Sequence, residues 1–259
     1  MEKVYSRTKG VLPDVVSGFC PGCMHSTVHK LIGEAAEELG KLDKLVRVEG
    51  VGCCGLGQFY VAHDATIAAH GRACAVATGI KRSSPDSLVY TYQGDGDLAS
   101  IGLAETMSAA NRGENFTVIF INNGIYGMTG GQMAPTTLLG MKASTAPNGR
   151  KAEEHGYPMH VCEILNQLKA PYYLERVSCN TPQNVIKARK AIKKGFQNQI
   201  DGKGFSLIEV VTSCPTNWGL STLDALKFLE DKMFAEYPLG VIRDKSREEK
   251  LEVAEWKEI

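Results

Sequence analysis

The 259-residue sequence lacks the features that mark nucleic-acid or membrane proteins. Its 29 Lys and Arg residues equal its 29 Asp and Glu residues, so no overall positive field exists to attract nucleic acid or an anionic membrane. No apolar run approaches the roughly 20 residues of a membrane-spanning helix. The first seven residues also lack the apolar core of a signal peptide. We therefore expect a cytoplasmic protein with no nucleic-acid and no membrane partner.

Internal repeats and a convincing domain boundary are also missing, so we expect one domain over residues 1–259. Its N-terminal arm would cover about residues 1–25 and its C-terminal tail about residues 238–259. Hydrophobic residues make up 43% of the chain, which supports a sizeable core. Apolar runs typical of strands alternate with helical patterns, and this predicts an α/β fold with a doubly wound, mostly parallel sheet. The expected strands are 45–48, 87–93, 116–121, 172–178 and 205–212, and the expected helices are 28–39, 72–80, 97–112, 159–168, 181–198 and 222–237.

Two polar turns follow two of these predicted strands. Gly94-Asp95-Gly96-Asp97 follows strand 87–93, and Asn122-Asn123 follows strand 116–121. The carboxyl ends of parallel strands meet at one sheet edge, where open α/β folds bind ligands. Oxygens from Asp95 and Asn123, with a backbone carbonyl, suit an octahedral Mg²⁺ that shares a diphosphate. The alternative is a tight turn with an Asp cap and an ordinary Asn-Asn-Gly loop.

Eight cysteines in a reducing cytosol favour metal ligands over a disulfide framework. Cys74, Cys162 and Cys179 occur singly in apolar or mixed surroundings and are interpreted as small buried residues. The other five lie in three predicted turns: Phe19–Cys23 (FCPGC), Gly50–Gly55 (GVGCCG), and Thr212–Thr216 (TSCPT) after a strand.

The C-x-x-C of Cys20 and Cys23 allows three interpretations. A thioredoxin-like redox pair is one, because the motif precedes a helix. A structural zinc site would need two more ligands, and a second C-x-x-C or a His pair is missing. An iron–sulfur cubane would use Cys20 and Cys23, one of Cys53 and Cys54, and Cys214. Spacing alone does not choose between zinc and iron–sulfur.

The motifs CPGC, GVGCCG, HGRA, GDGD, NNGIYGMTGGQ and SCPTNWG occur in this order between about residues 19 and 219. In this respect the chain resembles the β subunit of the 2-oxoacid:ferredoxin oxidoreductases. The resemblance implies a thiamine diphosphate-binding fold, with thiamine diphosphate, Mg²⁺ and one [4Fe–4S] cluster as cofactors. It implies Cys20, Cys23, Cys53 and Cys214 as cluster ligands. The doubled cysteine departs from the family pattern, and Cys53 is preferred over Cys54 because it keeps the G-x-G-C register.

The same resemblance assigns the metal and cofactor contacts. Asp95, Asn123 and the carbonyl of Ile125 would hold Mg²⁺, and the glycine-rich turn 126–132 would wrap the diphosphate with backbone N–H groups. His63 and His70 flank a stretch with a helix-like pattern. One interpretation is that His70 lies at the end of a helix and interacts with the helix dipole. The family pattern instead places the turn of His70 beside the diphosphate. The expected cofactor-binding residues are Val51, Gly52, Cys54, His70, Gly71, Arg72, Gly94, Gly96, Asp97, Gly127, Met128 and Thr129.

The resemblance also implies an incomplete active site. The glutamate that activates thiamine diphosphate comes from a partner α subunit, which carries the pyrimidine-binding domain, and we assign no catalytic residue to this chain. Glu105 lies in the middle of a predicted helix and is interpreted as a solvated residue or a surface pair. The irregular segment 133–157 is interpreted as a functional or interface loop at the subunit boundary. A ferredoxin and γ or δ subunits are further expected partners.

The implied activity is oxidative decarboxylation of a 2-oxoacid with coenzyme A. The resemblance also bears on the substrate, because relatives that use charged or small 2-oxoacids tend to have a Lys or Arg three residues after this cluster cysteine. Here the run is Cys53-Cys54-Gly55-Leu56, without a cation. This favours a branched-chain substrate of the 2-oxoisovalerate type over 2-oxoglutarate, the alternative. A hypothesis from another class is a non-redox thiamine diphosphate decarboxylase with a structural zinc. A third hypothesis is a regulatory or scaffold subunit with a degenerate site. The intact Asp95 and Asn123 argue against this hypothesis.

Overall fold

A seven-stranded sheet forms the centre of the computed structural model, which describes residues 6–247. Its strands lie in the order β2-β1-β3-β4-β8-β7-β9, and every neighbouring pair is parallel except β7 and β9. This confirms the predicted mostly parallel α/β fold. The strands are β1 (Leu45–Glu49), β2 (Asp64–Ile67), β3 (Leu88–Gly94), β4 (Thr117–Asn122), β7 (Tyr173–Ser178), β8 (Ser206–Val211) and β9 (Gly240–Asp244).

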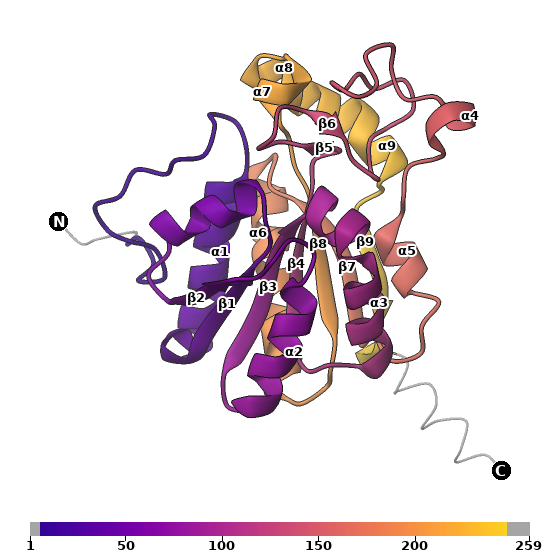
Figure 1. Cartoon of the computed structure of the whole chain (residues 1–259). Helices are drawn as coiled ribbons and strands as arrows, with labels where there is room; N and C mark the ends of the chain where they lie inside the picture. Colours follow the sequence, from indigo (N-terminus) through magenta and orange to yellow (C-terminus); the bar gives the residue numbers. More distant parts are fainter. Residues whose placement is uncertain (1–5, 248–259) are drawn as a thin grey trace.

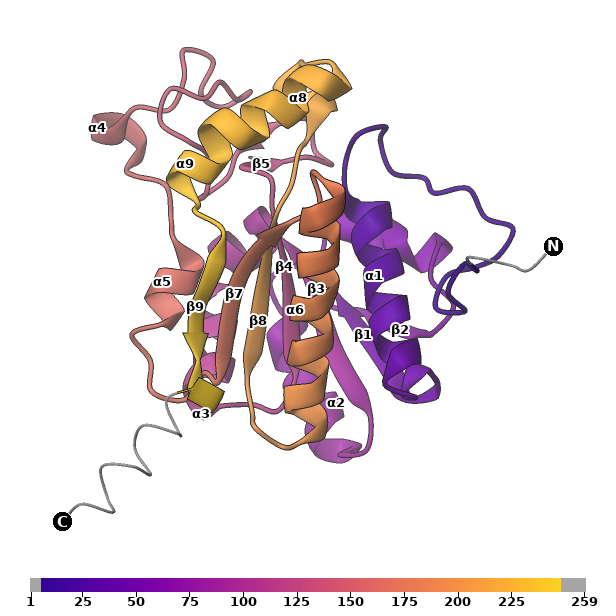
Figure 2. The same ribbon diagram turned by 180° about the vertical axis from the view of Figure 1, so that it is seen from behind.

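Helices cover both faces of the sheet, each over its own apolar core. Helices α1 (His25–Glu38) and α6 (Pro182–Ile200) pack on one face (Figure 2), around Ile32 and Phe196. Helices α2 (Ala73–Ser83), α3 (Leu103–Arg112) and α5 (Val161–Leu165) pack on the other (Figure 1), around Ala77 and Phe120. A sheet covered on both faces explains why strand β4 is fully buried and apolar over most of its length.

A third apolar cluster closes the carboxyl edge of the sheet, with Met141, Leu229 and Met233 at its centre. The segments around it lie above the strands in both views (Figures 1 and 2). They are β5 (Ile125–Tyr126), β6 (Gln132–Met133), α4 (Ala152–His155), α7 (Pro215–Trp218), α8 (Thr222–Phe228), a π-helical turn (Leu229–Met233) and α9 (Phe234–Glu236). The connections also contain 3-10 turns at Leu42–Lys44 and Cys53–Phe59.

Three local predictions were wrong. The stretch between His63 and His70 contains β2, an edge strand, because pairing with β1 outweighs its helix-like pattern. The helix expected to start at Asp97 begins as a π-helical turn, Gly96–Ile101, before α3. The segment predicted as a tail from about residue 238 begins with β9, which pairs with β7. Residues 1–5 of the predicted arm and residues 248–259 of the predicted tail lie outside the described residues. Across residues 6–247, no helix is long and apolar enough to cross a bilayer.

Candidate functional site

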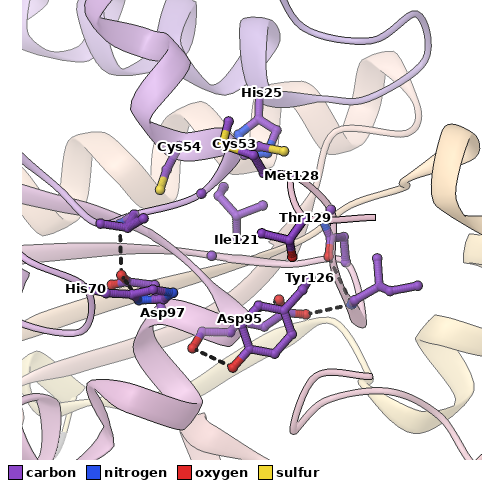
Figure 3. A pocket seen from close by; sticks show the side chains of 17 residues that line it. His25, Cys53, Cys54, His70, Asp95, Asp97, Ile121, Tyr126, Met128 and Thr129 are labelled. Atoms are coloured by element: carbon purple, nitrogen blue, oxygen red, sulfur yellow. Dashed lines mark hydrogen bonds and ion pairs between the residues drawn. The ribbon is translucent and has the colours of Figure 1, made fainter. Parts of the chain in front are cut away.

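A pocket of about 120 Å³ opens at the carboxyl edge of the sheet (Figure 3). In the sheet, β1 lies between β2 and β3, and β3 lies between β1 and β4. The chain leaves β1 toward β2 and leaves β3 toward β4, so the turns after β1 and β3 diverge at this edge. Open parallel sheets bind ligands in this crevice. The lining residues are His25, Val51, Gly52, Cys53, Cys54, His70, Gly94, Asp95, Gly96, Asp97, Ile121, Asn123, Ile125, Tyr126, Gly127, Met128 and Thr129.

Most of the residues singled out in the sequence therefore line one cavity. The segments after β1, β2, β3 and β4 each contribute, although they are far apart in the chain. Five predicted site residues are not part of the lining: Cys20, Cys23, Gly71, Arg72 and Cys214. Two lining residues were not predicted, His25 and Ile121, and Tyr126 was predicted only as the first residue of the glycine-rich turn. The position of His25 two residues after the C-x-x-C motif, at the start of α1, is a signal that could have found it.

Asp95 lies at the floor of the pocket with few open directions. Its Oδ1 accepts the backbone N–H of Gly96 at 2.8 Å, and its Oδ2 accepts the hydroxyl of Thr136 at 2.6 Å and the N–H of Ile125 at 3.1 Å. The same Ile125 N–H also lies 3.1 Å from Oδ1 of Asn123. The side-chain oxygens of Asp95 and Asn123 thus converge on one point of the backbone.

Burial raises the pKa of Asp95 to about 6, although the hydrogen bonds from Thr136 and the backbone oppose this effect. The pocket lining in residues 6–247 contains two buried carboxylates, Asp95 and Asp97, and no Lys or Arg. An anionic ligand would therefore need a cation with it, and a hard divalent ion suits the oxygen donors present.

Asp97 connects three turns. Its Oδ1 accepts the N–H of Val51 at 2.8 Å and of Gly71 at 2.9 Å, and its Oδ2 accepts Nε2 of Gln93 at 2.7 Å. Nδ1 of His70 lies 2.8 Å from Oδ1. A Cβ added at Gly50 would stand 2.3 Å from Oδ2, so only glycine allows this close approach. Because protein donors surround Asp97, its carboxylate positions the pocket walls.

Tyr126 packs directly on the GDG turn. Its hydroxyl donates to the carbonyl of Gly96 at 3.1 Å, and a Cβ at Gly96 would stand 2.1 Å from its ring. The second glycine of GDG is therefore required for this contact. Arg72, by contrast, turns away from the pocket and forms an ion pair with Glu105. This contact confirms that Glu105 is in a surface pair, and it leaves Arg72 without the expected position beside the pocket.

The cysteines of the three predicted turns gather at one end of the pocket. A Cβ at Gly127 would lie 3.3 Å from Sγ of Cys53 and 3.6 Å from Sγ of Cys214. The pKa of Cys23 is raised to about 11, mainly by burial and in part by the nearby Cys20 and Cys214. Burial also raises the pKa of Cys53 to about 12, with contributions from Cys214, Cys23 and Cys20. These four thiols are therefore electrostatic neighbours.

Cys54 has a different environment. It is fully buried, and its Sγ donates to the carbonyl of Gly50 at 3.2 Å. Burial raises its pKa, and among the charged groups Asp97 and Glu49 add more to this effect than Cys53 does. Cys74 and Cys162 are buried as predicted, and Cys179 is half-buried. In the part of the chain described, no three His, Cys, Asp or Glu side chains are grouped closely enough to hold a single metal ion.

Comparisons with known proteins agree with this site. The family "Thiamine pyrophosphate enzyme, C-terminal TPP binding domain" matches residues 50–210. The ketoisovalerate oxidoreductase subunit VorA of Methanothermobacter thermautotrophicus is 48% identical over 96% of this chain and 52% of its own length. The 2-oxoglutarate synthase subunit KorB of Methanocaldococcus jannaschii is 39% identical over 89% of this chain and 82% of its own.

A solved structure of a 2-oxoacid oxidoreductase also matches this chain. The 2-oxoglutarate:ferredoxin oxidoreductase of Magnetococcus marinus, determined with 2-oxoglutarate, coenzyme A and succinyl-CoA bound, superposes with a TM-score of 0.72 and 28% identity. The match covers 90% of this chain and 82% of that one. This chain spans about half the length of the VorA relatives. It belongs to the family of thiamine diphosphate-binding subunits of the 2-oxoacid:ferredoxin oxidoreductases.

Proposed function

We propose that this chain is the thiamine diphosphate- and cluster-binding subunit of an enzyme that oxidises a 2-oxoacid. The overall reaction converts the 2-oxoacid and coenzyme A into acyl-CoA, CO₂, one proton and two electrons, and two ferredoxins accept the electrons one at a time. The observation that carries the proposal is the position of Gly127, which joins the Asp95–Asn123 pocket to the thiols of Cys53 and Cys214. A cofactor site and a redox site thus share one wall.

Asp95, Asn123 and the carbonyl of Ile125 would hold Mg²⁺. The fit is supported by the convergence of the Asp95 and Asn123 oxygens on the Ile125 amide. It is also supported by the pocket's two buried carboxylates, whose charge a divalent ion would offset. When bound, thiamine diphosphate supplies the electron sink for decarboxylation. Asp97 positions the turns that carry Val51, Gly71 and His70 around it.

Cys20, Cys23, Cys53 and Cys214 would ligate a [4Fe–4S] cluster. The other three thiols each raise the pKa of Cys53, which supports this set. Cys54 fits it less well, because its thiol donates to the carbonyl of Gly50 in the turn after β1. Nδ2 of Asn217 donates to Sγ of Cys214 at 3.4 Å. Hydrogen bonds to ligand sulfurs tune the reduction potential of such clusters.

Partner subunits are needed to complete the enzyme. Within residues 6–247, the pocket lining contains no glutamate that could activate thiamine diphosphate. We propose that an α subunit provides this glutamate with the pyrimidine-binding domain, that γ or δ subunits accompany it, and that a ferredoxin receives the electrons. Coenzyme A and a 2-oxoacid are the small-molecule substrates.

A branched-chain 2-oxoacid of the 2-oxoisovalerate type fits this chain's side of the pocket best. The wall presents Val51, Ile121 and Met128, and a cation for a second carboxylate is missing from the described lining. The relative at 48% identity is named for ketoisovalerate. The alternative is 2-oxoglutarate, the substrate in the names of the KorB relative and of the Magnetococcus marinus enzyme.

The test is anaerobic purification of the chain with its co-expressed partner subunits. We expect about four iron and four labile sulfide per chain, and fastest ferredoxin reduction with 2-oxoisovalerate among 2-oxoisovalerate, 2-oxoglutarate, pyruvate and an arylpyruvate. A clear preference for 2-oxoglutarate would replace the substrate assignment. Zinc without iron or sulfide, together with coenzyme A-independent decarboxylation, would favour a non-redox decarboxylase.

A further inference from the structure

We propose that Thr136 is a positioning residue for the metal-binding carboxylate of Asp95, and that the loop carrying it forms one wall of the metal site. Thr136 lies 41 residues after Asp95, outside the GDG and NN motifs. Its side chain is fully buried beside the floor of the pocket. The inference rests on the proposed function, because it concerns the Mg²⁺ that would bind with thiamine diphosphate.

Hydrogen bonds to Asp95 determine which of its oxygens is free. An ionised carboxylate has about four acceptor positions. On Oδ2, the Thr136 hydroxyl and the Ile125 N–H occupy two, at 2.6 and 3.1 Å. On Oδ1, the Gly96 N–H donates at 2.8 Å, and the backbone N–H of Gly124 is a further neighbour that lowers the pKa of Asp95, so Oδ1 is less fully occupied than Oδ2. The Thr136 hydroxyl therefore turns the carboxylate so that Oδ1 is the oxygen available to a cation.

The next residue holds the other half of the metal site. The hydroxyl of Thr137 donates to the carbonyl of Gly124 at 2.6 Å and accepts the N–H of Ala134 at 2.8 Å. Gly124 lies between Asn123 and Ile125, the other two expected ligands. Two adjacent threonines thus hold the turn after β3 and the turn after β4 at a fixed separation.

The loop is rigid enough to act in this way. The buried guanidinium of Arg150 donates to the carbonyls of Pro135 at 2.8 Å and Thr137 at 2.7 Å, on either side of Thr136. The hydroxyl of Tyr237 donates to the carbonyl of Thr136 itself at 2.8 Å. The backbone of Thr136 is therefore fixed from two directions, and its hydroxyl reaches Asp95 without further ordering.

The experiment measures Mn²⁺ affinity, in place of Mg²⁺, by the EPR signal of the free ion. It uses the complete complex at saturating thiamine diphosphate. Thr136→Val keeps the shape and removes the hydroxyl, and we expect Mn²⁺ to bind about 10- to 100-fold more weakly, the usual effect of losing a hydrogen bond to a metal ligand. Thr136→Ser restores the hydroxyl and is expected to stay within about twofold of wild type. Thr106→Val is the control, because that buried hydroxyl donates to the Gly102 carbonyl in its own helix.

Two outcomes would overturn the proposal. One is wild-type Mn²⁺ affinity in Thr136→Val. The other is equal weakening in Thr136→Val and Thr136→Ser, which would show that binding weakens whether or not the hydroxyl is present. Should Thr136→Val not fold, Thr136→Ala carries the test, because it also removes the hydroxyl that donates to Asp95; wild-type Mn²⁺ affinity there would also overturn it. A wild-type complex that binds neither Mn²⁺ nor thiamine diphosphate would instead contradict the proposed function.

Discussion

Single side chains in this protein are placed by neighbours that are distant in sequence. Asp95 is held by Thr136, and Asp97 is held by N–H groups of Val51 and Gly71. These two aspartates of the GDGD motif therefore have different tasks, although they are only two residues apart. Asp95 keeps its Oδ1 less fully occupied than its Oδ2, while the oxygens of Asp97 face protein donors.

At Asp95, we expect the substitution Asp95→Ala to abolish Mg²⁺-dependent binding of thiamine diphosphate, because the remaining ligands are neutral oxygens and a hard divalent ion prefers carboxylate. Titration calorimetry of the complex with thiamine diphosphate, with and without Mg²⁺, measures this. The matched control is Asp86→Ala, since Asp86 lies outside the candidate site. Unchanged binding in Asp95→Ala would place the metal elsewhere.

At the cysteine pair, we expect Cys53→Ser to remove the cluster and Cys54→Ser to retain it. Cys53 neighbours the other three thiols, and Cys54 is fully buried against the Gly50 carbonyl. Iron and sulfide analysis with low-temperature EPR of the reduced protein distinguishes the variants. The reverse pattern, with the cluster lost only in Cys54→Ser, would identify Cys54 as the ligand.

At the scale of elements, the strands 88–94, 117–122, 173–178 and 206–211 could be predicted within one or two residues. Their buried apolar runs are imposed by helices on both faces of the sheet. The edge strands β2 and β9 could not be predicted. All four residues of β2 are exposed, so its sequence has no burial pattern, and its pairing with β1 decides its conformation.

The irregular segment 133–157 was predicted only as a functional or interface loop. In the structure, the buried side chain of Arg150 helps to order it by donating to backbone carbonyls on both of its sides, among them those of Pro135, Thr137 and Tyr157. A segment without a hydrophobic period can thus be ordered by one cation that satisfies many buried carbonyls. The sequence offers no local signal for such contacts.

We expect Arg150→Met to lower the free energy of unfolding by about 3 kcal/mol, because several buried carbonyls would lose their donor. Urea denaturation measures the loss, and limited proteolysis would locate new cleavage within residues 133–157. Lys151→Met is the matched control, since Lys151 is exposed and pairs with exposed Glu154; we expect its stability to match that of the wild type. Equal stability of both variants would show that Arg150 does not anchor the loop.

At the scale of the whole molecule, two buried histidines, His25 and His29, and the half-buried His63 make folding depend on pH. Burial lowers the pKa of His25 and of His63 to about 4, and lowers that of His29 as well. The folded protein keeps these side chains neutral, whereas the unfolded chain binds protons below a pKa of about 6.5. Their contribution to stability is therefore complete above pH 6.5 and is lost as the pH falls toward 4.

His63 allows this dependence to be measured at one site. Its Nε2 lies 2.8 Å from the hydroxyl of Tyr90, and the side chain is half-buried at the sheet's α1 face. We expect the wild type to lose about 1–2 kcal/mol more stability than His63→Gln between pH 6.5 and 5.0. Urea denaturation at both pH values measures this difference. The same measurement at pH 8, where His63 is neutral in the folded and the unfolded protein, gives the loss of stability that the substitution causes independently of protonation. Parallel pH profiles of the two proteins would contradict the assignment.

The sequence by itself determined the alternation of strands and helices, the turns that carry Asp95, Asn123 and the cysteines, and the family. These follow from local periodicity and from motifs within short stretches. Only the tertiary structure decided that Cys53, not Cys54, faces the other thiols, that Arg72 turns toward Glu105, and that Thr136 holds Asp95. The physical reason is that such contacts join residues far apart in the chain, so they depend on how the sheet edge and the loop above it pack together.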